Sequence, residues 1–175
     1  MKHTRKGFSL IELLIVVAII LIISAIAIPN LLRSRMAAHD AAAASTLRNL
    51  NNSQAAYIAE FGSSIGYSDT MLKLGPGVPC DQTHACLMDD VLACASEPCL
   101  KSGFGFFLTS TASTLPISDY TATATPISLG QSGQFNFCAT DDGVVRQEIV
   151  PSTTLGTALT HTQCTDQTKY LPLSK

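Results

Sequence analysis

Residues 6–32 read KGFSLIELLIVVAIILIISAIAIPNLL, and this stretch decides the fold. From Phe8 to Ile28 the only polar residues are Ser9, Glu12 and Ser24. As a helix, these residues would reach about 32 Å, which is close to the hydrocarbon thickness of a bilayer. Apolar residues would occupy every face of that helix, so an amphipathic surface helix does not explain the pattern. The segment is therefore predicted to enter a membrane.

Charge is distributed unevenly along the chain of 175 residues. Residues 1–7 carry Lys2, Arg5 and Lys6 without any acid, whereas the whole chain has a formal net charge of −2. The positive-inside bias then places the N-terminus in the cytoplasm and everything after Leu32 on the other side. Charged residues make up 14% of the chain and hydrophobic residues 46%. This composition excludes a disordered tail, a coiled coil and a basic nucleic-acid-binding protein, so no nucleic acid partner is expected.

Three kinds of N-terminal segment fit these features. An ordinary secretory signal would be cut after the small-residue triplet Ala25-Ile26-Ala27, and a plain single-span anchor would be retained. Glu12 argues against both, because a carboxylate at membrane depth costs roughly 2.5–3.5 kcal/mol and neither segment has a use for it. The helical pattern also continues past Ala27.

Residues 30–61 contain nine alanines and neither Gly nor Pro, which predicts a helix that ends at Gly62. One mostly apolar stripe recurs at spacings of three and four residues: Leu47, Leu50, Gln54, Ile58 and Phe61. The charged side chains are expected to lie off this stripe, in solvent: Arg33, Arg35, Asp40, Arg48 and Glu60.

The junction Lys6-Gly7-Phe8-Ser9-Leu10-Ile11-Glu12-Leu13-Leu14 resembles the leader junction of type IV prepilins and of type II secretion pseudopilins. In that family a membrane aspartic peptidase cuts after the glycine of a short basic leader (a class III signal peptide), and the new N-terminal residue is N-methylated. The resemblance implies cleavage between Gly7 and Phe8 and methylation of Phe8. It also places the glutamate that sets the assembly register on Glu12 and the helix-bending proline on Pro29.

The chemistry of Glu12 is consistent with that implied role. After cleavage the free amino group of Phe8 would lie one helical turn from Glu12. A nearby cation is the usual means of keeping a buried carboxylate charged, and in the family the pairing runs between neighbouring subunits. The alternative is that Glu12 faces a water defect or is protonated.

The composition changes at Gly62, after which a globular head is expected. A helix of one or two turns capped by Ser68 is predicted to end at Gly75, and another short helix is predicted around residues 85–95. Strands are predicted at Phe104–Thr111, Tyr120–Ser128, Phe135–Thr140 and Val144–Val150, the last two joined by the hairpin turn Asp141-Asp142-Gly143. The Ser- and Thr-rich stretch 109–132 favours exposed strand edges and loops.

The predicted fold class is α+β, with a long N-terminal hydrophobic helix followed by an antiparallel sheet of about four strands packed on it, which is also the pilin layout. The expected parts are a cleaved leader (1–7), a transmembrane and filament-core helix (8–32), its amphipathic second half (33–61), and a disulfide-bonded head (62–175). The head would divide into a loop region (62–102) and a sheet with the C-terminal region (103–175).

All six cysteines lie past the membrane segment: Cys80, Cys86, Cys94, Cys99, Cys138 and Cys164. An even number in the translocated part indicates disulfides formed in an oxidising compartment. The pilin resemblance favours the pair Cys138–Cys164, with the other four joined among themselves. A metal site of Cys80, His84 and Cys86 is the rival interpretation, although this spacing is poor for structural zinc.

Neither an enzymatic activity nor a cofactor is predicted. The four histidines, of which His39 lies on the helix and His161 in a loop-like stretch, belong to no nucleophile motif. Asp141 and Asp142 could coordinate calcium, as the major pseudopilins do in a C-terminal loop, but they fit a hairpin turn better. The glycosylation sequon Asn51-Asn52-Ser53 lies in the middle of the predicted helix and is discounted.

The expected function is that of a structural subunit of a type IV pilus-like filament, processed by prepilin peptidase and polymerised with other copies through its N-terminal helix. It would first lie in the bacterial inner membrane as a single-pass protein with its C-terminus outside the cytoplasm. Assembly machinery would then move it into a cell-surface pilus or a periplasmic pseudopilus. One alternative is a type II secretion pseudopilin, and another is a secreted, disulfide-rich binding or enzymatic domain released after Ala27 by ordinary signal peptidase.

Overall fold

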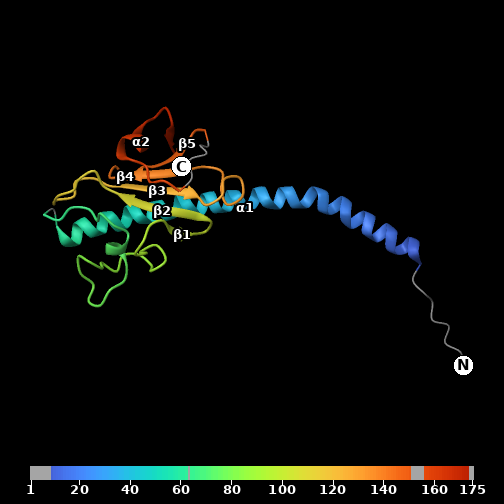
Figure 1. The fold of residues 1–175 in the computed structure, drawn as a ribbon, viewed down its shortest axis with the longest axis horizontal. Coiled ribbons are helices and arrows are strands. Elements are labelled where there is room, and N and C mark those ends of the chain that lie inside the picture. Colours follow the sequence, from blue (N-terminus) through green and yellow to red (C-terminus); the bar gives the residue numbers. More distant parts are fainter. Residues whose placement is uncertain (1–8, 63, 151–155, 174–175) are drawn as a thin grey trace, which may run out of the picture. The chain divides into compact units, whose positions relative to one another are not determined.

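The computed structural model describes residues 9–62, 64–150 and 156–173. The chain forms two compact units, Met1–Arg35 and Met36–Lys175, and helix α1 (Leu10–Phe61) contributes to both. The fold class is α+β, as the sequence predicts, because a long apolar N-terminal helix precedes an antiparallel sheet (Figure 1).

Helix α1 ends where the sequence predicts. Gly62 has a φ of +85°, a left-handed conformation that glycine adopts without the penalty of a Cβ atom, and its N–H donates to the carbonyl of Ile58 at 3.1 Å. The buried face of α1 repeats at spacings of one, three and four residues: Ala43, Ala44, Leu47, Leu50, Ser53, Gln54 and Tyr57. Of the predicted stripe, Leu47, Leu50 and Gln54 are buried, whereas Ile58 and Phe61 are half-buried.

The described part of the head carries one six-stranded sheet in which each strand pairs antiparallel with the next strand along the chain. The strands are β1 (Cys99–Lys101), β2 (Phe104–Thr109), β3 (Thr121–Pro126), β4 (Phe137–Thr140), β5 (Val145–Glu148) and β6 (Tyr170–Pro172). The sequence predicts the four central strands to within a few residues. It misses β1 and β6, which have three residues each and are too short to show a periodic pattern.

The prediction of two short α-helices before the sheet is wrong. In place of a helix capped by Ser68, the chain forms the 3₁₀ helix η1 (Leu72–Leu74), and no side-chain hydrogen bond caps it. Residues 85–95 form turns instead of a helix. Their N–H groups are engaged elsewhere, because Ala85 N–H donates to the Lys73 carbonyl at 2.8 Å and Cys86 N–H to the Gly75 carbonyl at 2.8 Å. A short helix α2 (His161–Thr165), with a capping box at Thr160 and Gln163, lies where none was predicted.

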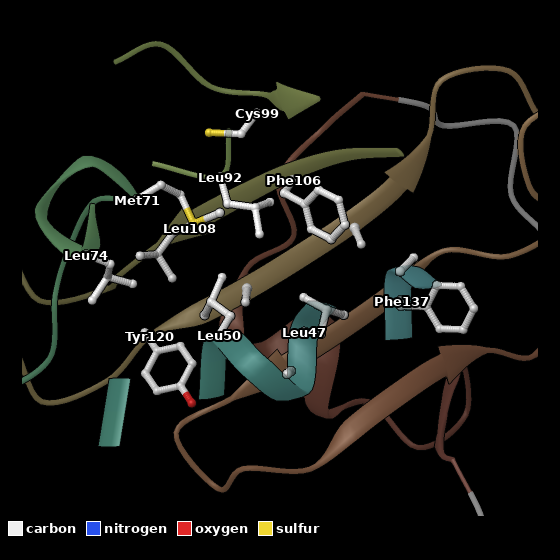
Figure 2. Packing of buried hydrophobic residues seen from close by; sticks show 14 of the residues in the cluster. Leu47, Leu50, Met71, Leu74, Leu92, Cys99, Phe106, Leu108, Tyr120 and Phe137 are labelled. Atoms are coloured by element: carbon white, nitrogen blue, oxygen red, sulfur yellow. The ribbon is translucent and has the colours of Figure 1, made fainter. Parts of the chain in front are cut away.

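One face of the sheet packs on the buried face of α1 and forms the core. Figure 2 shows Leu47 and Leu50 of α1 with Phe106 and Leu108 of β2, all of which belong to one cluster of buried side chains. β3 contributes only alanines to this cluster, namely Ala122 and Ala124, both fully buried. Leu47 and Leu50 of α1 belong to the same cluster as these two alanines.

The threonines of β3 are buried, which corrects the expectation of an exposed strand edge. Thr123 Oγ1 accepts a hydrogen bond from Leu159 N–H at 3.1 Å, and Thr125 Oγ1 accepts one from Gly156 N–H at 3.3 Å. Since side chains alternate between the faces of a strand, these threonines lie on the face opposite the core. Residues 156–169, here called the covering segment, therefore lie against that face, as the red part of the ribbon in Figure 1 shows beside β4.

Polar side chains of α1 hold the loop region that precedes the sheet. The Gln54 amide is fully buried and binds the backbone of Ser68 twice, donating to its carbonyl at 3.0 Å and accepting from its N–H at 2.8 Å. Tyr57 donates its hydroxyl proton to the Gln82 carbonyl at 2.6 Å. These contacts give partners to backbone groups of the loop region that precedes the sheet.

Asp40 is half-buried, although the sequence places it in solvent. Its Oδ1 accepts a hydrogen bond from Gln134 N–H at 3.0 Å, and His39 Nδ1 lies 3.0 Å from the Ser132 carbonyl oxygen. Burial raises the pKa of the Asp40 carboxyl, and the backbone hydrogen bonds oppose that rise only in part. Two polar side chains of α1 thus hold the loop between β3 and β4.

The turn between β4 and β5 forms at Asp141-Asp142-Gly143, as predicted. Gly143 has a φ of +72°, and Asp142 accepts hydrogen bonds from Thr140 Oγ1 and Val144 N–H, both at 2.9 Å. Asp142 also forms an ion pair with Arg146. Burial alone would raise the pKa of Asp142, but the hydrogen bonds from Arg146, Val144 and Thr140 outweigh it and lower the pKa to about 2.

Replacing Gln54 with leucine should destabilise the head. The change leaves the N–H and carbonyl of Ser68 without their partner in a buried environment, and each such group costs about 1–3 kcal/mol. We expect Gln54→Leu to lower the free energy of unfolding by about 2 kcal/mol or more in urea titrations of the detergent-solubilised chain. The exposed neighbour change Asn52→Leu is the control and should stay within about 0.5 kcal/mol of wild type. Equal effects of the two variants would contradict the role of Gln54.

The ion pair of Asp142 should contribute to the loss of stability in acid. Its pKa is lowered on folding, so its contribution is complete above about pH 4 and is lost as the pH falls towards 2. Asp142→Asn should therefore flatten the decline of the melting temperature between about pH 4 and 2, while lowering it at neutral pH. Asp90→Asn is the control, since Asp90 is an exposed carboxylate outside the β4–β5 turn. An unchanged acid slope in Asp142→Asn would refute the assignment.

Candidate assembly interface

The first unit exposes almost all of its apolar side chains. The large hydrophobic residues from Leu10 to Leu32 each retain between 47% and 80% of their surface. Within the described residues, α1 contains an 18-residue window with a mean hydropathy of 3.2, long and apolar enough to cross a membrane; it lies in the blue part of α1 in Figure 1. Soluble monomers rarely expose contiguous apolar patches beyond a few hundred Å². This surface therefore needs a covering of lipid or of other protein chains.

Glu12 lies in the first turn of α1 and binds the end of its own helix. Its Oε2 accepts a hydrogen bond from Ser9 N–H at 2.9 Å, and Glu12 N–H donates to the Ser9 carbonyl at 3.1 Å. This is the reach-back half of a capping box, and the positive end of the helix dipole favours the carboxylate there. Sequence reasoning missed this role, although the spacing Ser-x-x-Glu in front of an apolar run is its usual signature.

A carboxylate in this position can accept further donors. The Ser9 contact engages Oε2, and a carboxylate has acceptor lone pairs on both oxygens. Glu12 is exposed on a surface that is otherwise apolar, so a cation from another chain can reach it. The expected cleavage pair, Gly7 and Phe8, lies outside the described residues.

Helix α1 continues through Pro29 without a break. Proline has no N–H to donate, so the carbonyl four residues earlier loses its intrahelical partner. The bend implied at Pro29 stays a prediction.

The cysteines form three disulfides within the head. Cys138 of β4 is bonded to Cys164 of α2, and the other bonds are Cys80–Cys86 and Cys94–Cys99. The metal interpretation is wrong, because Cys80 and Cys86 bind each other. No free cysteine and no group of three metal-ligating side chains occurs in the portion of the chain that the structure describes.

The remaining candidates have structural partners. Asp141 lies 2.8 Å from His161 Nε2, which links the β4–β5 turn to α2. Asp142 pairs with Arg146, so protein groups bind both carboxylates that were considered as calcium ligands. The Asn51 amide of the sequon donates to the Gly143 carbonyl at 3.0 Å and accepts from the Tyr120 hydroxyl at 3.1 Å. The exposed apolar helix is thus the feature of the described chain that needs a partner.

Comparison with known proteins leads to one family. The prokaryotic N-terminal methylation motif matches residues 2–28, which include the leader junction and most of the apolar stretch. The chain is 39% identical over 70 residues to the type IV major pilin protein PilA of Myxococcus xanthus, covering 37% of this chain and 32% of that protein. It is 36% identical over 102 residues to the type IV wide pilus major component PilA4 of Thermus thermophilus. That match covers 58% of this chain and 75% of PilA4, and with the methylation motif it shows that the chain belongs to the type IV pilin family.

Proposed function

We propose that this chain is a structural subunit of a type IV pilus, made as a prepilin and polymerised with other copies of itself through α1. The observation that carries the proposal is the exposed apolar surface from Leu10 to Leu32. The bilayer would cover this surface before assembly, and the equivalent helices of other subunits would cover it in the filament. The described head would form the outer part of the filament.

The transfer from membrane to filament needs a driving contact other than apolar burial. Lipid tails are about as apolar as leucine, so exchanging lipid for another helix gains little hydrophobic free energy. A carboxylate at membrane depth, in contrast, costs roughly 2.5–3.5 kcal/mol, and a cation beside it offsets that cost. Glu12 would therefore favour the filament if a neighbouring subunit supplies a cation.

The cation we assign is the amino group created by maturation. Prepilin peptidase would cut between Gly7 and Phe8 and Phe8 would then be N-methylated, a scheme that the match of the methylation motif to residues 2–28 supports. The new amino group would bind Glu12 of a neighbouring subunit and set the register of the two helices. The Ser9 hydrogen bond would keep the carboxylate at the start of α1 for this purpose.

The compartments follow from the same features. The apolar helix and the basic leader fit a subunit stored in the inner membrane with its head outside the cytoplasm. Three disulfides in the head fit an oxidising compartment. Assembly machinery would then move the subunit to the cell surface.

The two alternatives have less support. A type II secretion pseudopilin would share the helix and the leader, but both relatives are described as pilus components. Release after Ala27 by ordinary signal peptidase would divide α1, which continues as one helix to Phe61 and carries the core residues of the head in its second half.

Gly7→Val should block maturation, because the peptidase must fit the residue before the scissile bond into a tight site. We expect a membrane-bound precursor that retains Lys2, Arg5 and Lys6, identified by mass spectrometry of the intact protein. Wild-type protein should begin with methylated Phe8, whereas a start at Ile28 would show ordinary secretion. Ala27→Val is the matched control and should mature normally. A mature Gly7→Val product of normal length would count against the peptidase assignment.

Removing the charge of Glu12 should prevent polymerisation without preventing processing. Breaking one side of a buried ion pair costs about 3–5 kcal/mol, which lowers each assembly step by a factor of several hundred or more. We expect Glu12→Val to accumulate as mature protein in the inner membrane and to give few or no filaments in electron micrographs of sheared surface material.

Glu12→Gln separates the hydrogen bond that this side chain accepts from Ser9 from the effect of its charge. Its amide oxygen can still accept the Ser9 hydrogen bond, but it carries no charge, so we expect it to fail as Glu12→Val does. The exposed Glu60→Gln is the control and should form filaments, with a deletion strain as the zero level. Wild-type filament yield from Glu12→Gln at equal subunit levels would refute the register role. Filaments confined to the periplasm in wild type would favour the pseudopilin alternative.

A further inference from the structure

Two arginines follow directly after the apolar surface of α1. Arg33 and Arg35 are both exposed, and the helix continues through them without a break. No Asp or Glu occurs between Glu12 and Asp40, so neither arginine has an acid within the three or four residues that a helical ion pair requires. Neither guanidinium forms a hydrogen bond or an ion pair with any residue that the structure describes. Both charges are therefore available to a partner.

The length of the apolar run places these charges at a defined depth in a bilayer. At 1.5 Å per residue, the helix from Leu10 to Leu32 is about 33 Å long, slightly more than the hydrocarbon core of about 30 Å. Arg33 and Arg35 lie about 1.5 and 4.5 Å further along the helix axis. The headgroup layer on each side of the core is about 5–7 Å thick. When the apolar run crosses the core, both guanidiniums therefore lie among the lipid phosphates at the far side.

Aromatic anchors are absent from this level of the helix. Trp and Tyr are the residues that usually hold a helix at a membrane interface. The chain has no Trp, and its first Tyr is Tyr57. Arginine can take the same role, because its stem packs along apolar surface while its guanidinium forms two parallel hydrogen bonds with a phosphate. Arg33 and Arg35 are therefore the side chains suited to anchor this end of the apolar run.

The positions of the two arginines favour lipid over a single neighbouring chain. With 3.6 residues per turn, Arg33 and Arg35 are about 200° apart around α1, on nearly opposite sides of the helix. An acidic patch on one other protein could contact only one of them at a time. Lipid headgroups surround a membrane helix and can bind both.

We propose that Arg33 and Arg35 bind the phosphates of anionic phospholipids, in the leaflet that faces away from the cytoplasm, and hold the stored subunit at a fixed depth. The inference rests on the membrane storage proposed above and adds the class of lipid to it. Loss of the leader (1–7) would leave the apolar helix with side-chain cations at this end alone. Zwitterionic lipids also carry a phosphate, but their own cationic group competes for it, which favours anionic lipids.

Lipid selectivity can be measured on the full mature chain in phosphatidylcholine bilayers with spin-labelled lipids as probes. The electron paramagnetic resonance spectrum separates lipids in contact with the protein from bulk lipids. It gives the association constant of phosphatidylglycerol relative to phosphatidylcholine. Arg33→Gln/Arg35→Gln removes both charges, whereas Arg33→Lys/Arg35→Lys keeps them. Arg48→Gln is the matched control, because Arg48 is an exposed arginine of the same helix in the unit that forms the head.

Wild type should prefer phosphatidylglycerol. One arginine at an anionic surface changes affinity by about fivefold, and averaging over all lipids around the helix reduces the measured preference to about threefold. We expect the lysine variant and Arg48→Gln to keep this preference. The double glutamine variant should lose at least about half of it, and the amino group at the start of the mature helix accounts for any preference that is left.

The inference is overturned if wild type has no preference for phosphatidylglycerol, or if the double glutamine variant keeps the wild-type preference. In the second case, a loss of filaments by that variant would place the arginines at a contact with another subunit. An equal loss of preference in Arg48→Gln would also overturn it. So would a loss caused by inorganic phosphate but not by chloride at the same ionic strength, because the arginines would then bind a free anion.

Flotation of the vesicles on a density gradient distinguishes a failure of this inference from a failure of the proposed function. A chain that floats with the vesicles but shows no lipid preference contradicts the lipid assignment alone. A chain that does not float contradicts the membrane storage of the subunit and the lipid assignment together.

Discussion

An α-helix satisfies its own backbone hydrogen bonds whatever surrounds it, and the rest of this protein depends on that property of α1. Over 52 residues the same backbone serves an apolar surface at its beginning and a packed core at its end. An open sheet edge or an irregular loop could not present the side chains from Leu10 to Leu32 to lipid, because its backbone groups would lose their partners there. The second half of α1 then supplies the surface on which the head folds, through Leu47 and Leu50.

Besides the sheet and its core, side chains that bind backbone hold the head together. Gln54 and Tyr57 reach from α1 to the loop before the sheet, and Thr123 and Thr125 reach from β3 to the covering segment. In each case a polar side chain replaces a missing backbone partner. The disulfide Cys138–Cys164 adds a covalent link between the sheet and the covering segment.

The parts of the fold that sequence predicts are those with a repeating or local signal. The long apolar run, the stop at Gly62 and the turn at Asp141-Asp142-Gly143 are of this kind, and each is present in the structure. β1 and β6 have no such signal, because they exist only through pairing with β2 and β5.

The side chains that were misjudged are polar ones whose partners lie far away along the chain. Asp40 binds the backbone of Gln134, and Thr123 binds the backbone of Leu159. Because these partners are distant in sequence, composition alone places both side chains in solvent. The Ser9–Glu12 contact is different, because its partners are three residues apart and their spacing could have predicted it.

The alternation of alanine and threonine in β3 limits which substitutions the strand can accept. Its sequence, Thr-Ala-Thr-Ala-Thr-Pro, has the composition of a linker. Yet a larger side chain at Ala122 or Ala124 would crowd the buried cluster, and a residue without a hydroxyl at Thr123 or Thr125 would lose a hydrogen bond to the covering segment. We therefore expect few substitutions among homologues in β3, although its composition resembles that of a linker. Substitutions should accumulate first in the disulfide-closed loops of the head.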